Sequence, residues 1–219
     1  MSGFIEVLDH GHVGLIDHMG SDLSISRAAR VSYNAEARPI DAGLINYLMK
    51  NHHTTPFEAV EFTFDIKAPI FVLRQWHRHR TWSYNELSGR YRELPQEFYV
   101  PELDQITMQS SDNKQMRTDE QNSDAVDIQN CMWAAGNYGF NEYKRMLEMG
   151  CPRELARTVL PLSTYSHMFA SVDLHNLFGF LKSRLHDHAQ YEIRVYAEAM
   201  LKLIEPIVPL AVASFKEFS

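Results

Sequence analysis

The chain has 219 residues, 45% of them hydrophobic, which is enough for one sizeable core. Its formal net charge of -7 argues against general affinity for nucleic acid, because phosphate-backbone binders usually carry a broad excess of Lys and Arg. The two cysteines, Cys131 and Cys151, are too few for a disulfide framework and match no metal-binding spacing, so we expect reduced thiols. Neither a membrane-spanning apolar run nor a signal-like start is found. We therefore expect one cytoplasmic domain over residues 1–219.

The first third of the chain predicts a β-hairpin followed by two helices. Two β-type runs, at residues 4–8 and 13–16, flank a turn-forming segment. Asp22 stands where it could cap a helix that continues to about Val31. Apolar residues that fall on one face predict a second helix over residues 41–51, and the segment that ends at Pro56 breaks it.

A strand followed by a short helix is predicted next. Phe62, Phe64 and Ile66 alternate with polar residues, which is the pattern of a half-buried strand, and Pro69 ends it. The apolar run 70–76 is opened by this proline and therefore predicts a helix. If that helix continues to Arg80, Arg74 and Arg78 share one of its faces.

The remainder of the chain predicts mainly helix. Residues 101–124 are polar, and we expect a surface excursion with at most local helix there. Helices are predicted over residues 124–148, 171–182 and 185–204. The totals favour an α+β fold that is rich in helix around a modest antiparallel sheet.

Five arginines and a single acid, Glu86, lie between residues 74 and 92. Like charges at helical i,i+4 spacing cost a few tenths of a kcal/mol, unless an anion such as phosphate lies between them. A solvated basic face is the simpler interpretation. However, directional polar groups and Gly89, which allows a close backbone approach, favour a binding site. The arginines are Arg74, Arg78, Arg80, Arg90 and Arg92, and the polar residues are Gln75, His79, Ser83, Asn85, Glu86 and Ser88.

One motif in this stretch resembles a known signature. Arg78-His79-Arg80, followed after seven residues by Ser88, is similar to the signature of the flavin-dependent thymidylate synthases. Residues 53–58, 152–157 and 184–192 resemble further motifs of the family in the same order. The resemblance implies the family's fold and its reaction, the conversion of deoxyuridylate (dUMP) to thymidylate (dTMP). It also implies carbon from 5,10-methylenetetrahydrofolate, hydride from FAD that NADPH has reduced, and a homotetramer whose active sites are shared between subunits.

The same resemblance implies roles for individual residues. The FAD contacts would be His53, Thr55, Arg78, His79, Arg80 and Glu86, with Asp173 and His175. The nucleotide contacts would be Gln75, Arg78, Glu86, Leu87, Ser88, Gly89, Arg90, Arg157 and Arg184, with Gln75, Arg78 and Glu86 supplied by the neighbouring chain. Arg184 would be catalytic, because a guanidinium against the pyrimidine edge favours the ionised base and makes its C5 a better nucleophile. No metal is implied.

Two places depart from the family pattern. Asp173-Leu174-His175 stands where many relatives have Asn-Leu-Arg, and Gly179 stands where relatives commonly carry Asn or His. We assign no binding role to Gly179, and the loss of the larger residue at this position could weaken FAD affinity.

Neither cysteine lies among activating polar neighbours, which suits a reaction without an enzyme nucleophile. Ser88 is the other candidate nucleophile, but a serine needs an adjacent base, so nucleotide binding is the preferred role. Aromatic residues should line the stacked ligands, although side chains at such spacings more often belong to the core. The candidates are Trp76, Trp82, Tyr84 and Tyr91.

Three alternatives stay open. His186-Asp187-His188 with His52-His53 could indicate a metal-dependent nucleotide phosphohydrolase, but residues 186 and 188 would point about 200° apart on a helix. A nucleic-acid-binding module built on residues 74–92 would conflict with the acidic total. A flavin- and folate-dependent dUMP hydroxymethylase would use the same pyrimidine and folate as the methylating enzyme.

Overall fold

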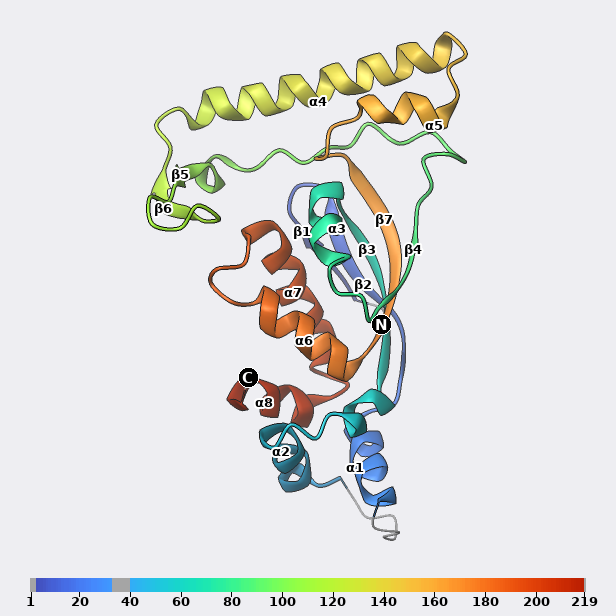
Figure 1. Cartoon of the computed structure of the whole chain (residues 1–219), viewed down its shortest axis with the longest axis vertical. Coiled ribbons are helices and arrows are strands. Elements are labelled where there is room, and N and C mark those ends of the chain that lie inside the picture. Colours follow the sequence, from blue (N-terminus) through green and yellow to red (C-terminus); the bar gives the residue numbers. More distant parts are fainter. Residues whose placement is uncertain (1–2, 33–39, 219) are drawn as a thin grey trace.

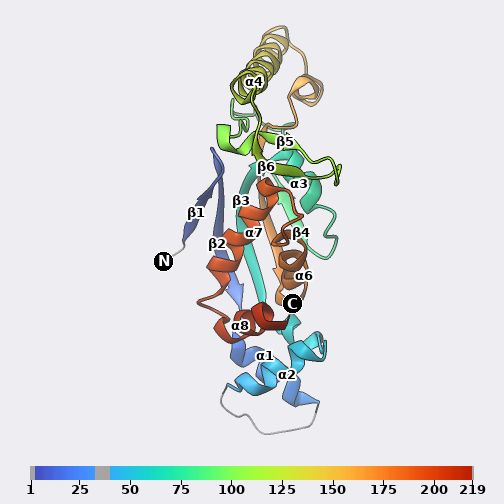
Figure 2. The same ribbon diagram turned by 90° about the vertical axis from the view of Figure 1, so that its left-hand side faces the viewer.

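The computed structural model describes residues 3–32 and 40–218. Five strands form an antiparallel sheet in the order β1-β2-β3-β7-β4, and helices α6 and α7 lie along one of its faces (Figures 1 and 2). The predicted helix-rich α+β fold is therefore confirmed. The strands are β1 (Phe4–Val7), β2 (Gly11–Met19), β3 (Glu61–Pro69), β4 (Ser83–Glu86) and β7 (Tyr165–Asp173).

The sheet has one apolar and one polar face, as the alternation in β3 predicts. Phe62, Phe64 and Ile66 are buried in the main core, whereas Thr63 and Asp65 are only partly buried on the opposite face. The predicted N-terminal hairpin is also correct, since β1 pairs with β2.

Six helices complete the main body. They are α1 (Asp22–Val31), α2 (Ala42–Lys50), α3 (Ile70–Trp76), α6 (Leu174–Arg184), α7 (Tyr191–Ile204) and α8 (Pro209–Phe218). The predicted cap of α1 is wrong, because Ser21 is the N-cap residue. The carboxylate of Asp22 instead accepts hydrogen bonds from the backbone N–H groups of Leu210 and Ala211, at 2.9 and 3.0 Å. It thereby satisfies orphan donors at the start of α8, a helix that the sequence analysis did not predict.

A long helix, α4 (Ala125–Glu148), lies across one end of the molecule beside α5 (Arg153–Ala156) and the short η3 (Arg157–Val159) (Figure 1). It confirms the helix predicted over residues 124–148. A small second core joins α4 to the segment that follows β4, where Phe98 packs on Phe140. Gly136 permits this approach, because a Cβ there would lie 2.3 Å from the Phe98 ring.

Several segments differ from the sequence predictions. Residues 101–124 contain η2 (Leu103–Gln105) and a two-stranded sheet of β5 (Thr107–Gln109) and β6 (Arg117–Gln121), so the expectation of at most local helix is wrong. Residues 171–173 end strand β7 and do not begin a helix. Residues 185–190 are irregular, and α7 begins only at Tyr191. Helix α3 ends at Trp76, so Arg78 does not share a helical face with Arg74.

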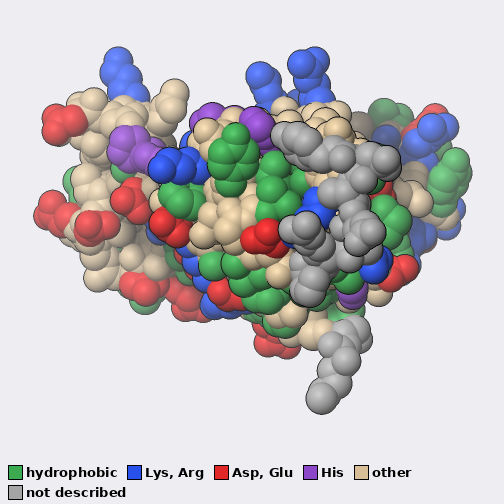
Figure 3. Space-filling model, turned by 90° about the horizontal axis from the view of Figure 1, so that it is seen from below, with side chains coloured by type: hydrophobic (Ala, Val, Ile, Leu, Met, Phe, Trp, Pro, Cys, Tyr) green, Lys and Arg blue, Asp and Glu red, His purple; other side chains and the backbone are tan. Residues whose placement is uncertain are grey.

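None of the helices in the described ranges has the length and hydropathy that crossing a bilayer requires. The end of the molecule that carries α1 and α2 is shown in Figure 3, where acidic and basic side chains are interspersed and form no single basic surface.

Candidate active site

The turn between α3 and β4 carries the histidine of the Arg-His-Arg motif. Tyr84 folds the turn back on α3, because its hydroxyl donates hydrogen bonds to the carbonyl oxygens of His79 (2.8 Å) and Trp76 (3.3 Å). Trp76 is buried and stacks on Phe180 of α6, with ring centroids 4.8 Å apart. The backbone of His79 is therefore held against the core while its imidazole stays half-buried.

Arg184 meets this histidine from the C-terminal end of α6. Its Nε donates to Nε2 of His79 at 3.1 Å, and its Nη2 donates to the carbonyl oxygen of Gln75 at 3.3 Å. The first bond requires a lone pair on Nε2, so the imidazole is neutral with its proton on Nδ1. Burial lowers the pKa of His79, and the positive charge of Arg184 lowers it further. Burial also lowers the pKa of Arg184, but an arginine keeps its charge at neutral pH.

The guanidinium of Arg184 retains binding capacity. Its Nη1 has no hydrogen-bond partner among the described residues, so this nitrogen can bind an acceptor on a ligand. The carbonyl oxygen of Gln75 accepts a hydrogen bond from Arg184, and the side chain of the same glutamine donates a hydrogen bond of 2.5 Å to Gln190. The structure thus brings Gln75, His79 and Arg184 together, and it adds Gln190, to which the sequence analysis gave no individual role.

A cavity of about 150 Å³ lies between α2, η1 (Thr55–Ala59), α6 and α8. His53 and His175, far apart in sequence, both line it together with Thr54, Gly179 and Lys182. A Cβ built on Gly179 would meet nothing within 4 Å, so the missing side chain leaves open space here. Thr55, the next residue in sequence after Thr54, is exposed to solvent. The cavity can accept only part of a ligand as large as FAD, and its imidazoles suit a planar aromatic ring.

Asp173 lies at the N-terminus of α6, beside this cavity wall. Its carboxylate accepts a hydrogen bond from the backbone N–H of Asn176 at 2.9 Å and therefore acts as the helix N-cap. A cap of this kind fixes where α6 begins and hence where His175 and Gly179 are presented.

The segment after β4 forms a second polar group beside α5. The Oγ of Ser88 accepts a hydrogen bond from the backbone N–H of Arg90 at 3.3 Å, and no base among the described residues contacts it. Gly89 is buried against Arg157, because a Cβ at Gly89 would lie 3.3 Å from Cδ of that arginine. Arg90 makes an exposed ion pair with Glu154 at 3.4 Å. Ser88, Gly89, Arg90 and Arg157 are therefore neighbours, which suits recognition of an anion.

Glu86 and Leu87 are tied to strand β7. The Oε1 of Glu86 accepts a hydrogen bond from Ser166 at 2.6 Å, and the backbone N–H of Leu87 donates to the carbonyl oxygen of His167 at 2.8 Å. We call Ser88, Gly89, Arg90 and Arg157 the Ser88 group, and Gln75, His79, Arg184 and Gln190 the Arg184 group. None of the hydrogen bonds and ion pairs of the described residues joins these two groups.

All five arginines of the stretch from residue 74 to residue 92 are exposed: Arg74, Arg78, Arg80, Arg90 and Arg92.

The aromatic candidates divide into core and surface residues. Trp76 and Trp82 are buried, and Trp82 stacks on Tyr84 with centroids 6.2 Å apart. Tyr91 is 84% exposed. Trp76, Trp82 and Tyr84 therefore shape the Arg-His-Arg turn from within the core, as aromatics at such spacings commonly do.

The histidines behind the phosphohydrolase alternative do not form a group of three metal-binding donors among the described residues. The expectation that residues 186 and 188 point in opposite directions on a helix is wrong, because both lie in an irregular segment. Their rings are only 4.8 Å apart. Nevertheless, the group of metal-binding donors found in the described part of the chain lies elsewhere and includes neither these residues nor His52 and His53.

Comparisons with known proteins show the family to which the chain belongs. Residues 14–210 match the family described as "Thymidylate synthase complementing protein". The chain is 48% identical over 216 residues to a "Flavin-dependent thymidylate synthase" of Wolbachia pipientis wMel, which covers 97% of this chain and 76% of that protein. It is 49% identical over 217 residues to the protein of that name from Treponema denticola, with 96% and 81% covered. The crystal structure of the UMP/dUMP methylase PolB from Streptomyces cacaoi, bound with 5-Br dUMP, superposes with a TM-score of 0.88 at 37% identity and covers 98% of both chains. This chain belongs to the family of flavin-dependent thymidylate synthases.

Proposed function

We propose that this protein methylates C5 of dUMP to give dTMP, with a flavin as its redox cofactor. Within the family that the comparisons establish, one observation of the structure carries the assignment. The half-buried Arg184 is held by His79 and Gln75 and keeps a guanidinium nitrogen available for a ligand.

Arg184 is the proposed catalytic residue. A cation against the edge of the uracil stabilises the negative charge that develops on the ring as C5 becomes nucleophilic. The hydrogen bond to neutral His79 and the contact with the Gln75 carbonyl orient the guanidinium before the nucleotide arrives, so little reorganisation accompanies the reaction. Both cysteines are free, and neither makes a hydrogen bond to Arg184, His79 or Gln75 in the described part of the chain, so the scheme uses no thiol nucleophile.

The Ser88 group is the proposed phosphate site. Arg90 and Arg157 supply cationic forks, and Gly89 lets the backbone approach a bound anion closely. The ion pair of Arg90 with Glu154 is solvent-exposed and therefore weak, so a phosphate can replace the carboxylate at little cost. Leu87, fixed to β7, would position this segment.

The cavity between α2 and α6 is the proposed site for part of FAD. His53, Thr55 and His175 would contact the cofactor there, with Asp173 fixing the helix start. Arg78, His79, Arg80 and Glu86 would complete its binding. When bound, the flavin supplies the hydride; NADPH is the proposed reductant and 5,10-methylenetetrahydrofolate the proposed carbon donor. The protein's part is to hold the three ligands in contact and to limit access of water.

A homotetramer with shared sites is the proposed assembly. Within one chain, the hydrogen bonds and ion pairs of residues 3–32 and 40–218 do not join the Ser88 group to the Arg184 group. Gln75, Arg78 and Glu86 would serve the nucleotide of a neighbouring subunit. Each chain would contribute a single catalytic domain, with residues 101–124 as an excursion at its surface. The proposed location of the assembly is the cytoplasm. Hydroxymethylation is not favoured, because the relatives are named thymidylate synthases and the structural neighbour is named a methylase.

Titration of the purified protein with FAD, followed by equilibrium dialysis against dUMP, tests the proposed function. The expected results are a perturbed flavin absorbance spectrum and retention of dUMP that phosphate ions weaken. A phosphohydrolase would instead release inorganic phosphate from dUMP without a flavin. A protein that binds neither FAD nor dUMP would overturn the proposal.

A further inference from the structure

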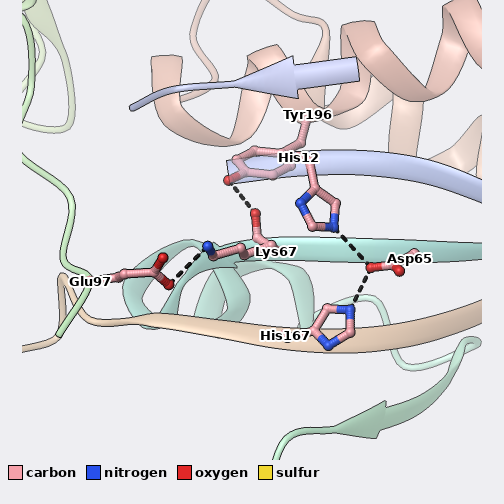
Figure 4. A network of polar contacts seen from close by, with 6 residues as sticks. All are labelled: His12, Asp65, Lys67, Glu97, His167 and Tyr196. Atoms are coloured by element: carbon pink, nitrogen blue, oxygen red, sulfur yellow. Dashed lines mark hydrogen bonds and ion pairs between the residues drawn. The ribbon is translucent and has the colours of Figure 1, made fainter. Parts of the chain in front are cut away.

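The polar face of the sheet carries a compact cluster of two imidazoles and one carboxylate. Nε2 of His12 lies 3.0 Å from Oδ1 of Asp65, and Nε2 of His167 lies 2.5 Å from the same oxygen. Figure 4 shows the two rings reaching Asp65 from opposite sides, from the neighbouring strands β2 and β7. The three donor atoms all lie within 4.8 Å of one another.

The strand register builds this cluster. Gly14 is paired with Asp65 across β2 and β3, so no side chain occupies the position directly opposite the carboxylate. His12 can therefore approach Asp65 diagonally. The ring of Phe4 lies against Gly14 and meets His12 edge-on at 5.2 Å, and Phe169 meets His167 in the same manner at 5.7 Å. The two phenylalanines flank the cluster with apolar surface.

The lysine on the same face of the sheet is paired with a carboxylate. Lys67 is the register partner of both His12 and His167, so it lies on the same face between them. Its Nζ, however, pairs with Glu97 at 2.8 Å, and Figure 4 shows the side chain directed away from Asp65. An incoming cation would therefore meet a carboxylate and two imidazoles without facing an unpaired ammonium group.

We propose that His12, Asp65 and His167 bind a divalent transition-metal ion such as Zn²⁺. Two imidazoles and one carboxylate are a ligand set typical of such ions, and open positions would be filled by water. Bond lengths of about 2.0–2.2 Å in tetrahedral geometry place donor atoms roughly 3.3 Å apart. Each imidazole therefore needs to withdraw from Oδ1 of Asp65 by less than about 1 Å, and the donor nitrogens of the two rings, which lie within 4.8 Å of each other, need to approach to about the same separation. The ligands come from the three adjacent strands β2, β3 and β7, so the ion would join these strands to one another. It would lie on the face of the sheet that α6 and α7 leave uncovered.

The experiment uses full-length protein without a histidine tag, stripped of metal with a chelator that is then removed. Titration with Co²⁺ alone is expected to give visible absorbance bands that saturate at one ion per chain and disappear when Zn²⁺ is added. Mg²⁺ should not compete, because it prefers oxygen ligands. FAD and dUMP binding are measured in parallel, so that failure of the metal site is distinguishable from failure of the proposed function.

Variants locate the ion. Asp65→Asn and His167→Asn should each weaken Co²⁺ binding by more than the roughly 10–100-fold that follows loss of an outer-shell partner. His18→Asn removes an exposed histidine from the same strand as His12 and should leave the affinity unchanged. The His167 side chain is 44% exposed, so its variant should fold even if Asp65→Asn does not. Absence of saturable Co²⁺ binding to the wild type, or equal affinity in His167→Asn, would overturn the proposal.

Discussion

Nε of Arg184 donates a hydrogen bond to Nε2 of His79 across 3.1 Å, which joins the end of α6 to the turn after α3. The two residues are 105 positions apart in sequence. The contact fixes the neutral tautomer of His79 and orients the guanidinium, so the proposed base-activating residue and a residue of the Arg-His-Arg motif form one unit.

Replacement of Arg184 should separate binding from catalysis. We expect Arg184→Ala to keep bound flavin but to lose nearly all turnover, because base activation acts in the transition state. Arg184→Lys retains the charge without the planar fork and should recover little activity. Flavin absorbance and steady-state rates measure the two effects, with Arg145→Ala on α4 as the control. Wild-type turnover in Arg184→Ala would refute the catalytic role.

The lowered pKa of His79 predicts a pH-dependent contribution to stability. Its ordinary value is 6.5, and the folded value lies below this. The contribution is therefore fully present above about pH 6.5, the unfolded value, and is lost as the pH falls through the folded pKa. In apo protein, His79→Gln should reduce the loss of unfolding free energy between about pH 7.5 and 5.5. Urea unfolding at both pH values measures this loss. An undiminished loss in the variant would contradict a depressed pKa.

Arg90 is predicted to contribute mainly to nucleotide affinity. Removing a charge-assisted partner of a phosphate costs roughly 1.5–3 kcal/mol, so Arg90→Ala should raise the dissociation constant of dUMP about 10- to 150-fold. Folding stability should change little, because the ion pair with Glu154 is exposed. Calorimetric titration with dUMP gives the affinity, and Arg145→Ala again serves as the control. Equal affinity in wild type and Arg90→Ala would remove Arg90 from the phosphate site.

Gly179 offers a gain-of-function test. A glycine inside a helix destabilises it by roughly 0.5–1 kcal/mol relative to alanine, and a Cβ fits here without contact, so Gly179→Ala should stabilise the protein by about that amount. Gly179→Asn places an amide at the wall of the proposed flavin cavity and should tighten FAD binding with no change for dUMP. Fluorescence titration with FAD compares the two variants. Weaker FAD binding in the asparagine variant would show that this wall does not face the cofactor.

The predictable parts of the fold are those whose sequence pattern is local. Strand β3 follows from its alternation, and α4 from its apolar spacing. Strand β7 was missed because Tyr165 and Ser166 are both buried, which breaks the alternation of apolar and polar residues. The Ser166 hydroxyl donates a hydrogen bond to Glu86, so a polar residue occupies a buried position. Helix α8 was missed because its start depends on Asp22, which is 188 residues from Leu210.

The candidate site likewise has features that local sequence patterns predict and features that depend on residues far apart in sequence. Family motifs locate the functional residues along the chain, but they do not give the contacts between them. The Arg184–His79 bond, and the cluster in which Asp65 is 53 residues from His12 and 102 from His167, arise only when distant strands and helices meet. No local spacing indicates such pairs.

The most direct test of the proposed reaction is the mass of its nucleotide product. Purified protein is incubated with FAD, dUMP, 5,10-methylenetetrahydrofolate and NADPH, and the nucleotide is analysed by mass spectrometry. The predicted product is heavier than dUMP by one CH2 group and co-elutes with dTMP, and its formation requires both folate and reductant. A product heavier by CH2O, or unchanged dUMP with flavin-loaded protein, would contradict thymidylate synthesis by this chain.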